Sequence, residues 1–304
     1  MNARNEWDVV IVGGGPAGLN AALALGRARK HVLLCDAGPR RNAAAKEMHN
    51  FATRDGIAPG EFRRIGREQL AQYPSVEVRD ENVESVTGER GAFRVKLRSG
   101  EVMTRRVLLT TGLIDEVMPI EGAKEAWGHT MIQCPYCHGW ELKDRPWGYL
   151  AREPHLSHAV PFTLMLRGWS REVSFFTNGL ELPAELRAQL QAGGVRVVTS
   201  PFKRLVSHDG ELERAEFADG SSMPLGALFV HPPQHHVALV QKLGVALNEE
   251  GFVRVDPMKC ETSVPGIFAA GDLTTRMQGA IFAAAAGMQA AAMLNLELTM
   301  ERPL

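Results

Sequence analysis

The chain has 304 residues, with 34 basic and 35 acidic side chains and a formal net charge of −1. Its length allows one large or two medium domains, and its balanced charge excludes a bulk attraction to nucleic acid or anionic lipid. The polar segment 1–7 lacks the apolar core of a signal peptide, and the apolar segment 280–294 is shorter than the ~20 residues that a membrane span needs. We therefore expect a cytoplasmic protein with neither a nucleic-acid nor a membrane partner.

A βαβ unit is predicted at the start of the chain. The β-branched run 8–13 is typical of a buried parallel strand. It is followed by a glycine-rich loop, by an alanine- and leucine-rich helix predicted over 16–29, and by a second strand predicted over 31–36. This order of elements is typical of folds that bind a dinucleotide at the first turn.

The loop of this unit has the residues that phosphate binding requires. Gly13, Gly15 and Gly18 match the pattern G-x-G-x-x-G. The first allows the tight turn, the second lets a pyrophosphate approach the backbone, and the third lets the helix pack on the strand. Free N–H groups at the helix start then bind the phosphates. Asp36, 18 residues beyond Gly18, is placed to accept hydrogen bonds from an adenosine ribose.

Two cysteines, Cys134 and Cys137, are separated by two residues and followed at once by His138. Such thiols can close into a small disulfide, and the imidazole can move the protons that thiol exchange requires. In a reducing compartment a close pair indicates catalysis or metal binding rather than a structural disulfide. Zinc sites use the same spacing but need four ligands, and the histidine cluster within 231–236 is remote in sequence. A redox pair is favoured, with zinc as the alternative.

The other two cysteines, Cys35 and Cys260, are isolated in the sequence. We expect both to be packing residues of the interior. Three aromatic residues, Trp127, Tyr136 and Trp140, lie near the redox pair in sequence. Aromatic side chains in such numbers are more often core residues than pocket residues.

Two further motifs bear on which dinucleotide binds. The segment 263–272 places Gly271 and Asp272 after an apolar strand, and an alanine-rich helix is predicted from about Gln278. This segment resembles the carboxy-terminal signature of two-dinucleotide flavoproteins, in which the aspartate binds the ribityl chain of FAD and the next helix start faces the isoalloxazine ring. The segment 108–112, Leu-Leu-Thr-Thr-Gly, resembles the internal strand-end motif of the same proteins.

With the redox pair between these two motifs, nearly the whole chain resembles the low-molecular-weight thioredoxin reductases. The resemblance implies an α/β fold: a three-layer ββα, Rossmann-like FAD domain (1–117 and 246–304) with a smaller inserted NADPH-type domain (118–245). It also implies a homodimer. The FAD contacts that it implies are Gly13, Gly15, Pro16, Ala17, Gly18, Asp36, Ala37, Asn50, Thr111, Gly112, Gly271, Asp272, Gln278, Gly279 and Ala280.

Within this family pattern, Cys137 corresponds to the thiol nearest the flavin and Cys134 to the thiol that exchanges with substrate. The family usually has an acid after its second cysteine, and here that position is His138. A histidine, with an ordinary pKa of ~6.5, can take up or return a thiol proton at neutral pH. We expect His138 to be the acid/base; the alternative is a histidine that only hydrogen-bonds the backbone.

The inserted domain departs from the reductases at its NADPH loop. Gly148 is present, but the next expected glycines are missing, and Glu153-Pro154 stands where phosphate oxygens would approach. Proline lacks an N–H donor, and glutamate repels phosphate. After the strand predicted over 172–177 no arginine cluster follows to hold the 2′-phosphate of NADPH. A helix over 184–191 and a strand over 195–198 keep the β-α-β order, so the scaffold is retained while NADPH binding is doubtful.

The segment 134–141, with 49–51 and 54–57, is similar to one branch of the family, the FAD-dependent dithiol oxidases that close disulfides in natural products such as gliotoxin and holomycin. The resemblance implies that a small dithiol is oxidised through the cysteine pair and FAD, with O2 as the electron acceptor and His49 as a second proton acceptor. The alternative is a disulfide reductase that takes electrons from NADPH atypically, or from ferredoxin, and reduces a thioredoxin-like protein. A third reading is a non-catalytic redox sensor.

Overall fold

The computed structural model describes residues 6–38, 40–153 and 156–301. The chain forms two compact units. The first, here called the dinucleotide unit, consists of Met1–Arg41, Phe51–Ile114 and Gln234–Leu304. The second, the dithiol unit, consists of Asp115–Pro233 and the short segment Asn42–Asn50.

The dinucleotide unit is built on a seven-stranded sheet in the order β3-β2-β1-β6-β5-β4, with β17 paired to β6. The strands β3, β2, β1, β6 and β17 are parallel, and β4, β5 and β6 form an antiparallel meander. The elements are β1 (Glu6–Val12), α1 (Pro16–Arg27), β2 (Val32–Cys35), α2 (Pro59–Leu70), β3 (Val76–Arg79), β4 (Val83–Glu89), β5 (Ala92–Leu97), β6 (Gly100–Leu109), α7 (Ala238–Lys242), β17 (Ile267–Ala269), the 3-10 helix η1 (Asp272–Thr274) and α8 (Ala280–Met300).

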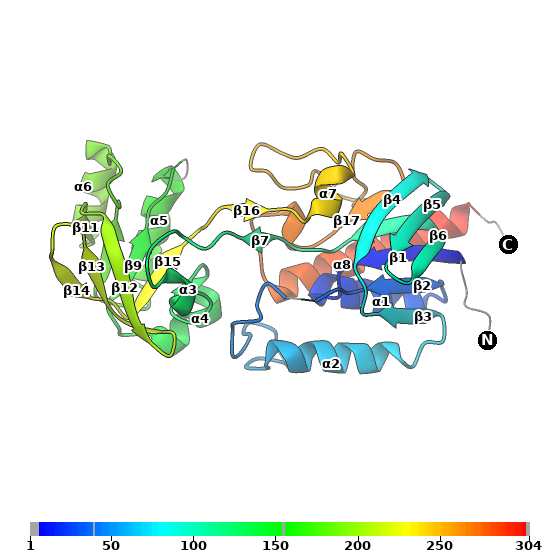
Figure 1. Ribbon diagram of the computed structural model, residues 1–304, viewed down its shortest axis with the longest axis horizontal. Helices are drawn as coiled ribbons and strands as arrows, with labels where there is room; N and C mark the ends of the chain where they lie inside the picture. The colour runs from blue at the N-terminus through cyan, green and yellow to red at the C-terminus, as the bar shows by residue number, and fades with distance from the viewer. Residues whose placement is uncertain (1–5, 39, 154–155, 302–304) are drawn as a thin grey trace. The chain divides into compact units, whose positions relative to one another are not determined.

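Side chains of β1 alternate between the two faces of this sheet, as strand geometry requires. Val9 and Ile11 pack with residues of α1 and α8, whereas Val10 and Val12 pack with residues of β4, β5 and α7. Figure 1 shows α1 and α8 side by side against the sheet. The unit therefore has three layers, and the predicted ββα, Rossmann-like architecture is confirmed.

Helix α8 contacts α1 very closely. A Cβ atom added at Gly287 would lie 2.1 Å from the carbonyl oxygen of Ala17, so only glycine fits this crossing. The expectation that the apolar segment after 280 is too short for a membrane span is wrong on length, because the helix continues through polar residues to Met300 and has 21 residues. By length and composition alone α8 could cross a membrane, but a core helix passes the same test, and one side of α8 is buried against α1 and the sheet.

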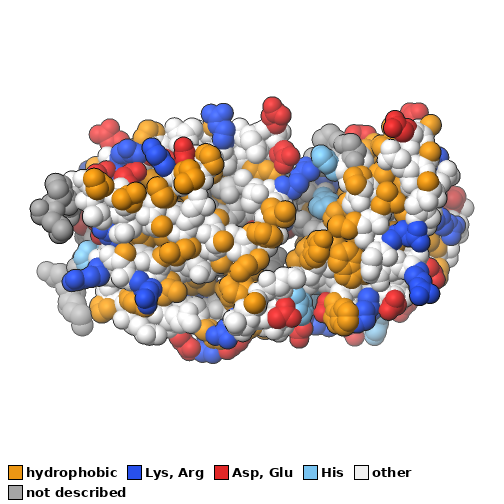
Figure 2. Space-filling model, turned by 180° about the vertical axis from the view of Figure 1, so that it is seen from behind, with side chains coloured by type: hydrophobic (Ala, Val, Ile, Leu, Met, Phe, Trp, Pro, Cys, Tyr) orange, Lys and Arg blue, Asp and Glu red, His pale blue; other side chains and the backbone are white. Residues whose placement is uncertain are grey.

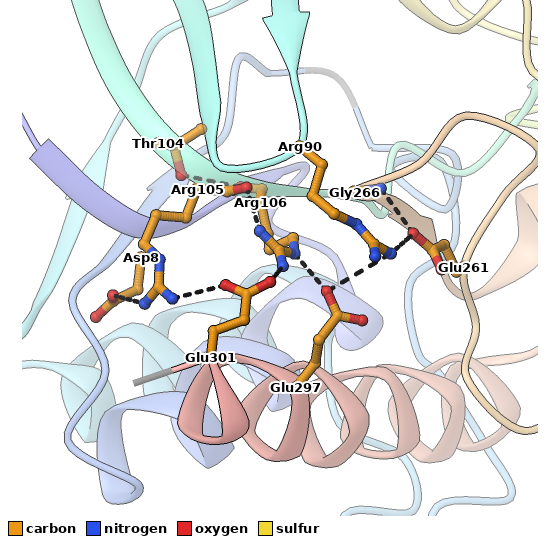
Figure 3. Close-up of polar contacts among 9 residues, drawn as sticks. All are labelled: Asp8, Arg90, Thr104, Arg105, Arg106, Glu261, Gly266, Glu297 and Glu301. Carbon is orange, nitrogen blue, oxygen red and sulfur yellow. Dashed lines mark hydrogen bonds and ion pairs between the residues drawn. The ribbon is translucent and has the colours of Figure 1, made fainter. Parts of the chain in front are cut away.

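The carboxy-terminal end of α8 is fixed to β6 by ion pairs (Figure 3). The fully buried Arg106 donates through Nε to Glu297 at 2.6 Å and also pairs with Glu301. Arg105 donates to Glu301 at 2.7 Å and to Asp8 at 3.2 Å. Residues from both ends of the sequence thus hold the helix on the sheet.

The dithiol unit has a five-stranded parallel sheet in the order β11-β10-β9-β15-β8 and a three-stranded antiparallel sheet, β12-β13-β14. Two short strands, β7 (Ile114–Asp115) and β16 (Gln234–His235), pair with each other and carry the chain from one unit to the other. The elements of the dithiol unit are α3 (Ala123–Ala126), β8 (Met131–Ile132), α4 (Pro135–Leu142), β9 (Trp147–Leu150), α5 (Leu156–Leu166), β10 (Val173–Phe176), α6 (Ala184–Ala192), β11 (Arg196–Val198), β12 (Phe202–His208), β13 (Glu211–Phe217), β14 (Ser222–Pro224) and β15 (Ala227–Val230).

The unit boundaries differ from the expected insert of 118–245 in two places. The segment 234–245 belongs to the dinucleotide unit, because Leu239, Val240 and Val245 pack in the same core as β4 and β5. The segment Asn42–Asn50 was expected in the FAD domain but packs with the dithiol unit. Sequence order alone does not show that this short loop packs with the other unit.

Candidate functional site

In the glycine loop after β1, an added side chain would clash with neighbouring backbone atoms at two positions. Gly13 has a φ of 110°, and a Cβ there would lie 2.4 Å from the carbonyl oxygen of Thr110. A Cβ at Gly18 would lie 1.9 Å from the carbonyl oxygen of Gly13. At Gly15, by contrast, a Cβ would meet nothing within 4 Å. The first and third glycines thus serve the turn and the packing, while the second leaves open space of the kind a pyrophosphate requires.

This open space adjoins the N-terminus of α1. Gly15 caps the helix without a side-chain hydrogen bond, and Pro16 takes the first helical position. The first N–H groups of a helix have no intrahelical partner and form its positive end. Ala17, in the same turn, lies under Gly271, whose added Cβ would be 3.1 Å from the Ala17 methyl. The turn is therefore shaped to receive an anion.

Asp36 follows the end of β2 and is buried against the glycine loop. A Cβ at Gly14 would lie 2.3 Å from Asp36 Oδ2. The same oxygen accepts a hydrogen bond from Arg63 Nε of α2 at 2.7 Å. Arg63 therefore holds the carboxylate beside the loop, where a ribose would meet it, and the next residue, Ala37, is exposed.

The ends of β6 and β17 complete this part of the dinucleotide unit. The Thr110 hydroxyl bonds the carbonyls of Val12 and Gly13 at 3.0 and 2.8 Å, and so connects β6 to the start of the glycine loop. Thr111 and Gly112 come next, with Gly112 at a φ of 62°. The predicted motif therefore lies beside the loop, but the buried connection is made by Thr110 rather than by Thr111.

Asp272 starts η1 and accepts a hydrogen bond from Arg41 Nη1 at 2.9 Å. The same Arg41 nitrogen donates to Gln278 at 2.6 Å. Gln278 in turn exchanges amide hydrogen bonds with Gln234 at 3.1 and 2.9 Å. These polar groups precede Gly279, which caps α8 at Ala280, so the carboxy-terminal motif is pre-arranged by Arg41 and Gln234.

The residues of the dinucleotide unit fit FAD. The observation that carries this fit is the open space at Gly15 together with the start of α1, where no side chain caps the first N–H groups. The residues that would hold the cofactor are those named in the two motifs and at the end of β6: Gly13, Gly15, Pro16, Ala17, Gly18, Asp36, Ala37, Thr111, Gly112, Gly271, Asp272, Gln278, Gly279 and Ala280.

In the dithiol unit, the two cysteines begin α4. Cys134 is the N-cap residue, Pro135 takes the first helical position, and Cys137 lies one turn along. The Cys137 Sγ atom lies 2.6 Å from the Cys134 Sγ atom, and the Cys137 N–H donates to the Cys134 carbonyl at 3.3 Å. The thiol hydrogen bond from Cys137 lowers the pKa of Cys134 to about 7, against the opposing effect of burial. A substantial fraction of Cys134 is therefore a thiolate at neutral pH, as a nucleophile requires.

The other cysteines behave as packing residues. Cys35 and Cys260 are buried, and burial raises the pKa of Cys35 to about 12 and raises that of Cys260. In the described part of the chain, no three His, Cys, Asp or Glu side chains gather in a way that could hold a metal ion.

His138 follows Cys137 on α4 and has its imidazole nitrogens inaccessible to solvent. Neither nitrogen has a hydrogen-bond partner among the residues that the structure describes, so a role limited to bonding the backbone gains no support. Burial lowers the pKa of His138; Glu141 opposes this effect, and His49 and His129 add to it. The imidazole is therefore neutral at pH 7 and able to accept a proton.

The segment 42–50 attaches to α4 at two points. Asn50, in a left-handed conformation with φ 62°, donates from Nδ2 to the Tyr136 carbonyl at 2.6 Å. His49 Nε2 lies 3.6 Å from Glu141 Oε1. Asn50 was expected as an FAD contact, and the structure places it in the dithiol unit with its amide engaged by Tyr136. The segment thus brings His49 to the helix of the redox pair.

Two of the three aromatic residues near the pair are exposed, contrary to the expectation of core positions. Tyr136 is 61% and Trp140 is 70% exposed. They are four residues apart on α4 and so share one side of the helix, where Tyr136 contacts the Trp169 ring edge-on at 5.3 Å and Lys143 lies over the Trp140 ring at 3.1 Å. Trp127, as expected, packs on a core cluster.

The described residues of the second nucleotide crevice depart from the family pattern for NADPH. Gly148 lies inside β9, where a Cβ would come within 2.2 Å of the Phe176 ring, so it is a packing glycine and not part of the loop. Beyond β9, Arg152 donates to the His231 carbonyl at 2.8 Å, and the Tyr149 hydroxyl lies 3.0 Å from His231 Nδ1. These contacts join the carboxyl ends of β9 and β15, between which a nucleotide binds in such sheets. Glu153 is exposed, and Pro154 lies outside the described residues.

Sequence patterns missed several residues of these sites: Arg41, Arg63, Thr110, Glu141 and Gln234. The two arginines pair with carboxylates that are remote in sequence, so no local pattern marks them. Thr110 and Glu141 did carry local signals: Thr110 lies in the motif 108–112, and Glu141 stands three residues beyond His138, one turn along the same helix.

A family model described as pyridine nucleotide-disulphide oxidoreductase matches residues 7–160 and 175–290. The chain is 31% identical to the thioredoxin reductase tcpT of Claviceps purpurea, over 98% of this chain and 96% of that protein. Its structure is similar to the crystal structure of HlmI, with a TM-score of 0.91 and 38% identity, covering 99% of this chain and 95% of that one. It is also similar to an oxidoreductase from Agrobacterium tumefaciens, with a TM-score of 0.90 and 38% identity, covering 98% and 100% of the two chains.

Proposed function

The chain belongs to the pyridine nucleotide-disulphide oxidoreductase family, as a thioredoxin reductase-like member whose family implies FAD, and from this premise we propose that it is a cytoplasmic FAD-dependent dithiol oxidase. The observation that carries the proposal is the contrast within the dithiol unit. The cysteine pair is assembled for thiol exchange, with the pKa of Cys134 lowered to about 7. The nucleotide crevice of the same unit lacks loop glycines and is bridged by Arg152 and His231. The pair thus receives electrons from a dithiol rather than from NADPH.

In the proposed reaction, a substrate thiolate attacks Cys134 of the oxidised pair. A bond forms between the substrate sulfur and Cys134, the Cys134–Cys137 bond breaks, and Cys137 leaves as a thiolate. The second substrate thiolate then attacks the sulfur of the first, closing the substrate disulfide and releasing Cys134. Two electrons now reside on the cysteine pair. The bound flavin supplies the route by which these electrons and two protons pass to O2, giving hydrogen peroxide and restoring the protein disulfide.

His138 handles the protons of this exchange. Its neutral imidazole accepts a proton when a thiol must become a thiolate, and returns a proton when a thiolate is released. Its position on α4, four residues beyond Cys134, puts it one turn along from the exchanging thiol.

Anaerobic mixing tests the direction of electron flow. The holoprotein is mixed with NADPH in one experiment and with dithiothreitol in another, and flavin absorbance is followed. We expect bleaching with dithiothreitol and none with NADPH, followed by stoichiometric peroxide on admission of air. Rapid bleaching by NADPH, or failure of dithiothreitol both to bleach the flavin and to consume O2, would contradict the proposal.

A disulfide reductase is the second candidate, because relatives such as tcpT carry the name thioredoxin reductase. In that case a thioredoxin-like protein would accept electrons from the cysteine pair, with reduced ferredoxin or NADPH as the donor. Reduction of thioredoxin by the ferredoxin-reduced protein, faster than oxidation of any small dithiol, would favour this candidate.

We also propose that the protein is a homodimer that uses the exposed side of α8. Figure 2 shows apolar side chains gathered on the surface of the molecule. Large apolar side chains are exposed along α8 at Ile281, Phe282, Met288, Leu296 and Met300, and an apolar surface of this kind marks an association site. Light scattering should give twice the mass of 33.3 kDa, and the change Leu296→Glu should give the monomer.

A further inference from the structure

The geometry points to Glu141 as a positioning residue for proton transfer at the redox pair, acting through His49. The inference rests on the proposed function for the direction of electron flow, but not for the proton step, because thiol exchange moves protons in both directions. It gives the carboxylate of Glu141 a role beside the predicted residues Cys134, Cys137 and His138, and it gives the predicted proton acceptor His49 a positioning partner.

Helix α4 carries three kinds of functional group one after another: thiols, an imidazole and a carboxylate. Cys134 and His138 are four residues apart, as are Cys137 and Glu141, so each pair lies one turn apart on the same side of the helix. A thiol, an imidazole and a carboxylate therefore follow one another along α4. This order runs from Cys134, the exchanging thiol at the N-terminal end of α4, to Glu141 near its C-terminal end.

Solvent exposure increases from His138 through His49 to Glu141. The two nitrogens of His138 are inaccessible and have no hydrogen-bond partner among the described residues. The His49 side chain is 17% exposed, and that of Glu141, 3.6 Å from His49 Nε2, is 43% exposed. A proton accepted by His138 has no direct access to water at either nitrogen. His49 and Glu141 supply groups that are partly in solvent and can pass it on.

The charged groups that face His138 come from three segments. Glu141 of α4 raises its pKa, whereas His49 of the segment 42–50 and His129 of the loop before β8 lower it. Glu141 is therefore the carboxylate that offsets two neighbouring bases. The carboxylate also holds His49 Nε2 toward α4, at 3.6 Å, while the Asn50–Tyr136 hydrogen bond of 2.6 Å fixes the adjacent backbone. Through this contact Glu141 holds the His49 imidazole beside α4.

The protons balance for the oxidation. Each turnover takes one proton from each of two substrate thiols, and the cysteine thiols formed by exchange give up two protons when their disulfide is restored. His138 takes up these protons one at a time, and His49, held by Glu141, exchanges them with water. The two protons that accompany the electrons to O2 complete the balance.

The test compares Glu141→Gln with the matched change Glu47→Gln. Glu47 lies at 3.5 Å from the same His49 nitrogen but is 56% exposed and belongs to the segment 42–50 itself. Reduction of the flavin by dithiothreitol is followed anaerobically across the pH range. Removal of Glu141 takes away a group that raises the pKa of His138, so the acid limb of the rate profile should move to lower pH. The plateau rate should fall about tenfold, a part of the usual effect of acid/base catalysis.

Three further variants separate positioning from general damage. Glu141→Asp should restore part of the plateau rate, and Glu47→Gln should leave the acid limb in place, because Glu141 and not Glu47 is among the groups that shift the pKa of His138. His49→Gln should slow the reaction as Glu141→Gln does, and the double variant should be no slower than either alone. Superimposable profiles for Glu141→Gln and the unaltered protein, or additive losses in the double variant, would overturn the inference.

A failure of the proposed function gives a different result. If dithiothreitol does not reduce the flavin at any pH, the direction of electron flow is wrong. The same variants are then reduced with dithionite and mixed with oxidised dithiothreitol, and the rate of thiol formation is compared across pH. The Glu141→Gln shift is expected in this direction too, and its absence there would overturn the inference.

Discussion

Arg106 of β6 and Glu297 of α8 form an ion pair of 2.6 Å in which the arginine is fully buried and the glutamate is partly exposed (Figure 3). This difference in exposure predicts unequal costs for removing the two partners. Glu297→Ala leaves a buried guanidinium with fewer acceptors, a situation that costs about 3 kcal/mol. Arg106→Met removes the buried charge and leaves Glu297 able to turn to water, so it should cost less.

Urea unfolding of the holoprotein measures both changes. The double variant Arg106→Met/Glu297→Ala should be more stable than Glu297→Ala alone, because it no longer contains the buried charge. Equal losses in the two single variants would mean that Glu301 and the Arg105 carbonyl, the other acceptors for Arg106, satisfy it sufficiently.

The ion pairs of Glu301 with Arg106 and Arg105 predict a loss of stability in acid. Burial alone would raise the pKa of Glu301, but Arg106 and Arg105 outweigh it and lower the pKa. A lowered folded-state pKa contributes stability that is present above the unfolded-state value of ~4.3 and is lost as the pH falls through the folded value. The slope of unfolding free energy against pH, measured between about pH 5 and 3, should therefore be shallower in Glu301→Gln. An unchanged slope would count against this pair.

The space at Gly15 predicts loss of cofactor without loss of fold. A Val side chain at this position meets no heavy atom within 4 Å of its Cβ, but it occupies the volume that a pyrophosphate needs. Gly15→Val should lower FAD affinity at least about tenfold, or by 1.4 kcal/mol, with far-UV circular dichroism unchanged. Gly60→Ala in α2, where an added Cβ meets Arg40 at 3.5 Å, is the control and should keep its flavin. Full flavin content in Gly15→Val would contradict the assignment of the loop.

The sequence predicts this loop well because its requirements are local. Gly13, Gly15 and Gly18 have fixed spacing, and each serves the turn, the opening or the packing that its position predicts. Gly148 shows the limit of such patterns. A glycine near a strand end fits either the strand or the loop; pairing with Ser174 and Leu228 places Gly148 in β9, and the Phe176 ring leaves no room there for a side chain.

The rest of the site depends on contacts between distant parts of the chain. Arg41 and Asp272 meet across 231 residues of sequence. The segment 42–50 packs with the dithiol unit, and its contacts with α4 are likewise remote in sequence. The exposure of Tyr136 and Trp140 likewise follows from the way α4 lies on its unit, because the residue types alone favour burial. Local periodicity contains none of this information.

The exposed aromatic residues predict a preference among dithiols. Tyr136 and Trp140 are exposed on the helix of the redox pair, and an aromatic contact with a substrate ring contributes ~1 kcal/mol. Tyr136→Ala and Trp140→Ala should therefore raise KM for an aromatic dithiol, benzenedimethanethiol, about fivefold each. KM for dithiothreitol, which has no ring, is the control and should not change. Equal changes for both substrates would show that the variants disturb the helix and not substrate binding.

Alkylation of the reduced protein tests the chemistry of the cysteine pair independently of any substrate. The pKa of Cys134 is lowered to about 7, first by the thiol hydrogen bond from Cys137 and then by backbone N–H groups. The rate of iodoacetamide modification should therefore rise with pH around a midpoint near 7 for one thiol. Cys35 and Cys260, which are buried and have raised pKa values, should react far more slowly. Cys137→Ala removes the donor with the largest effect, so the Cys134 midpoint should move up toward the ordinary thiol value of ~8.5. A midpoint that stays near 7 in Cys137→Ala would assign the activation to the backbone at the start of α4.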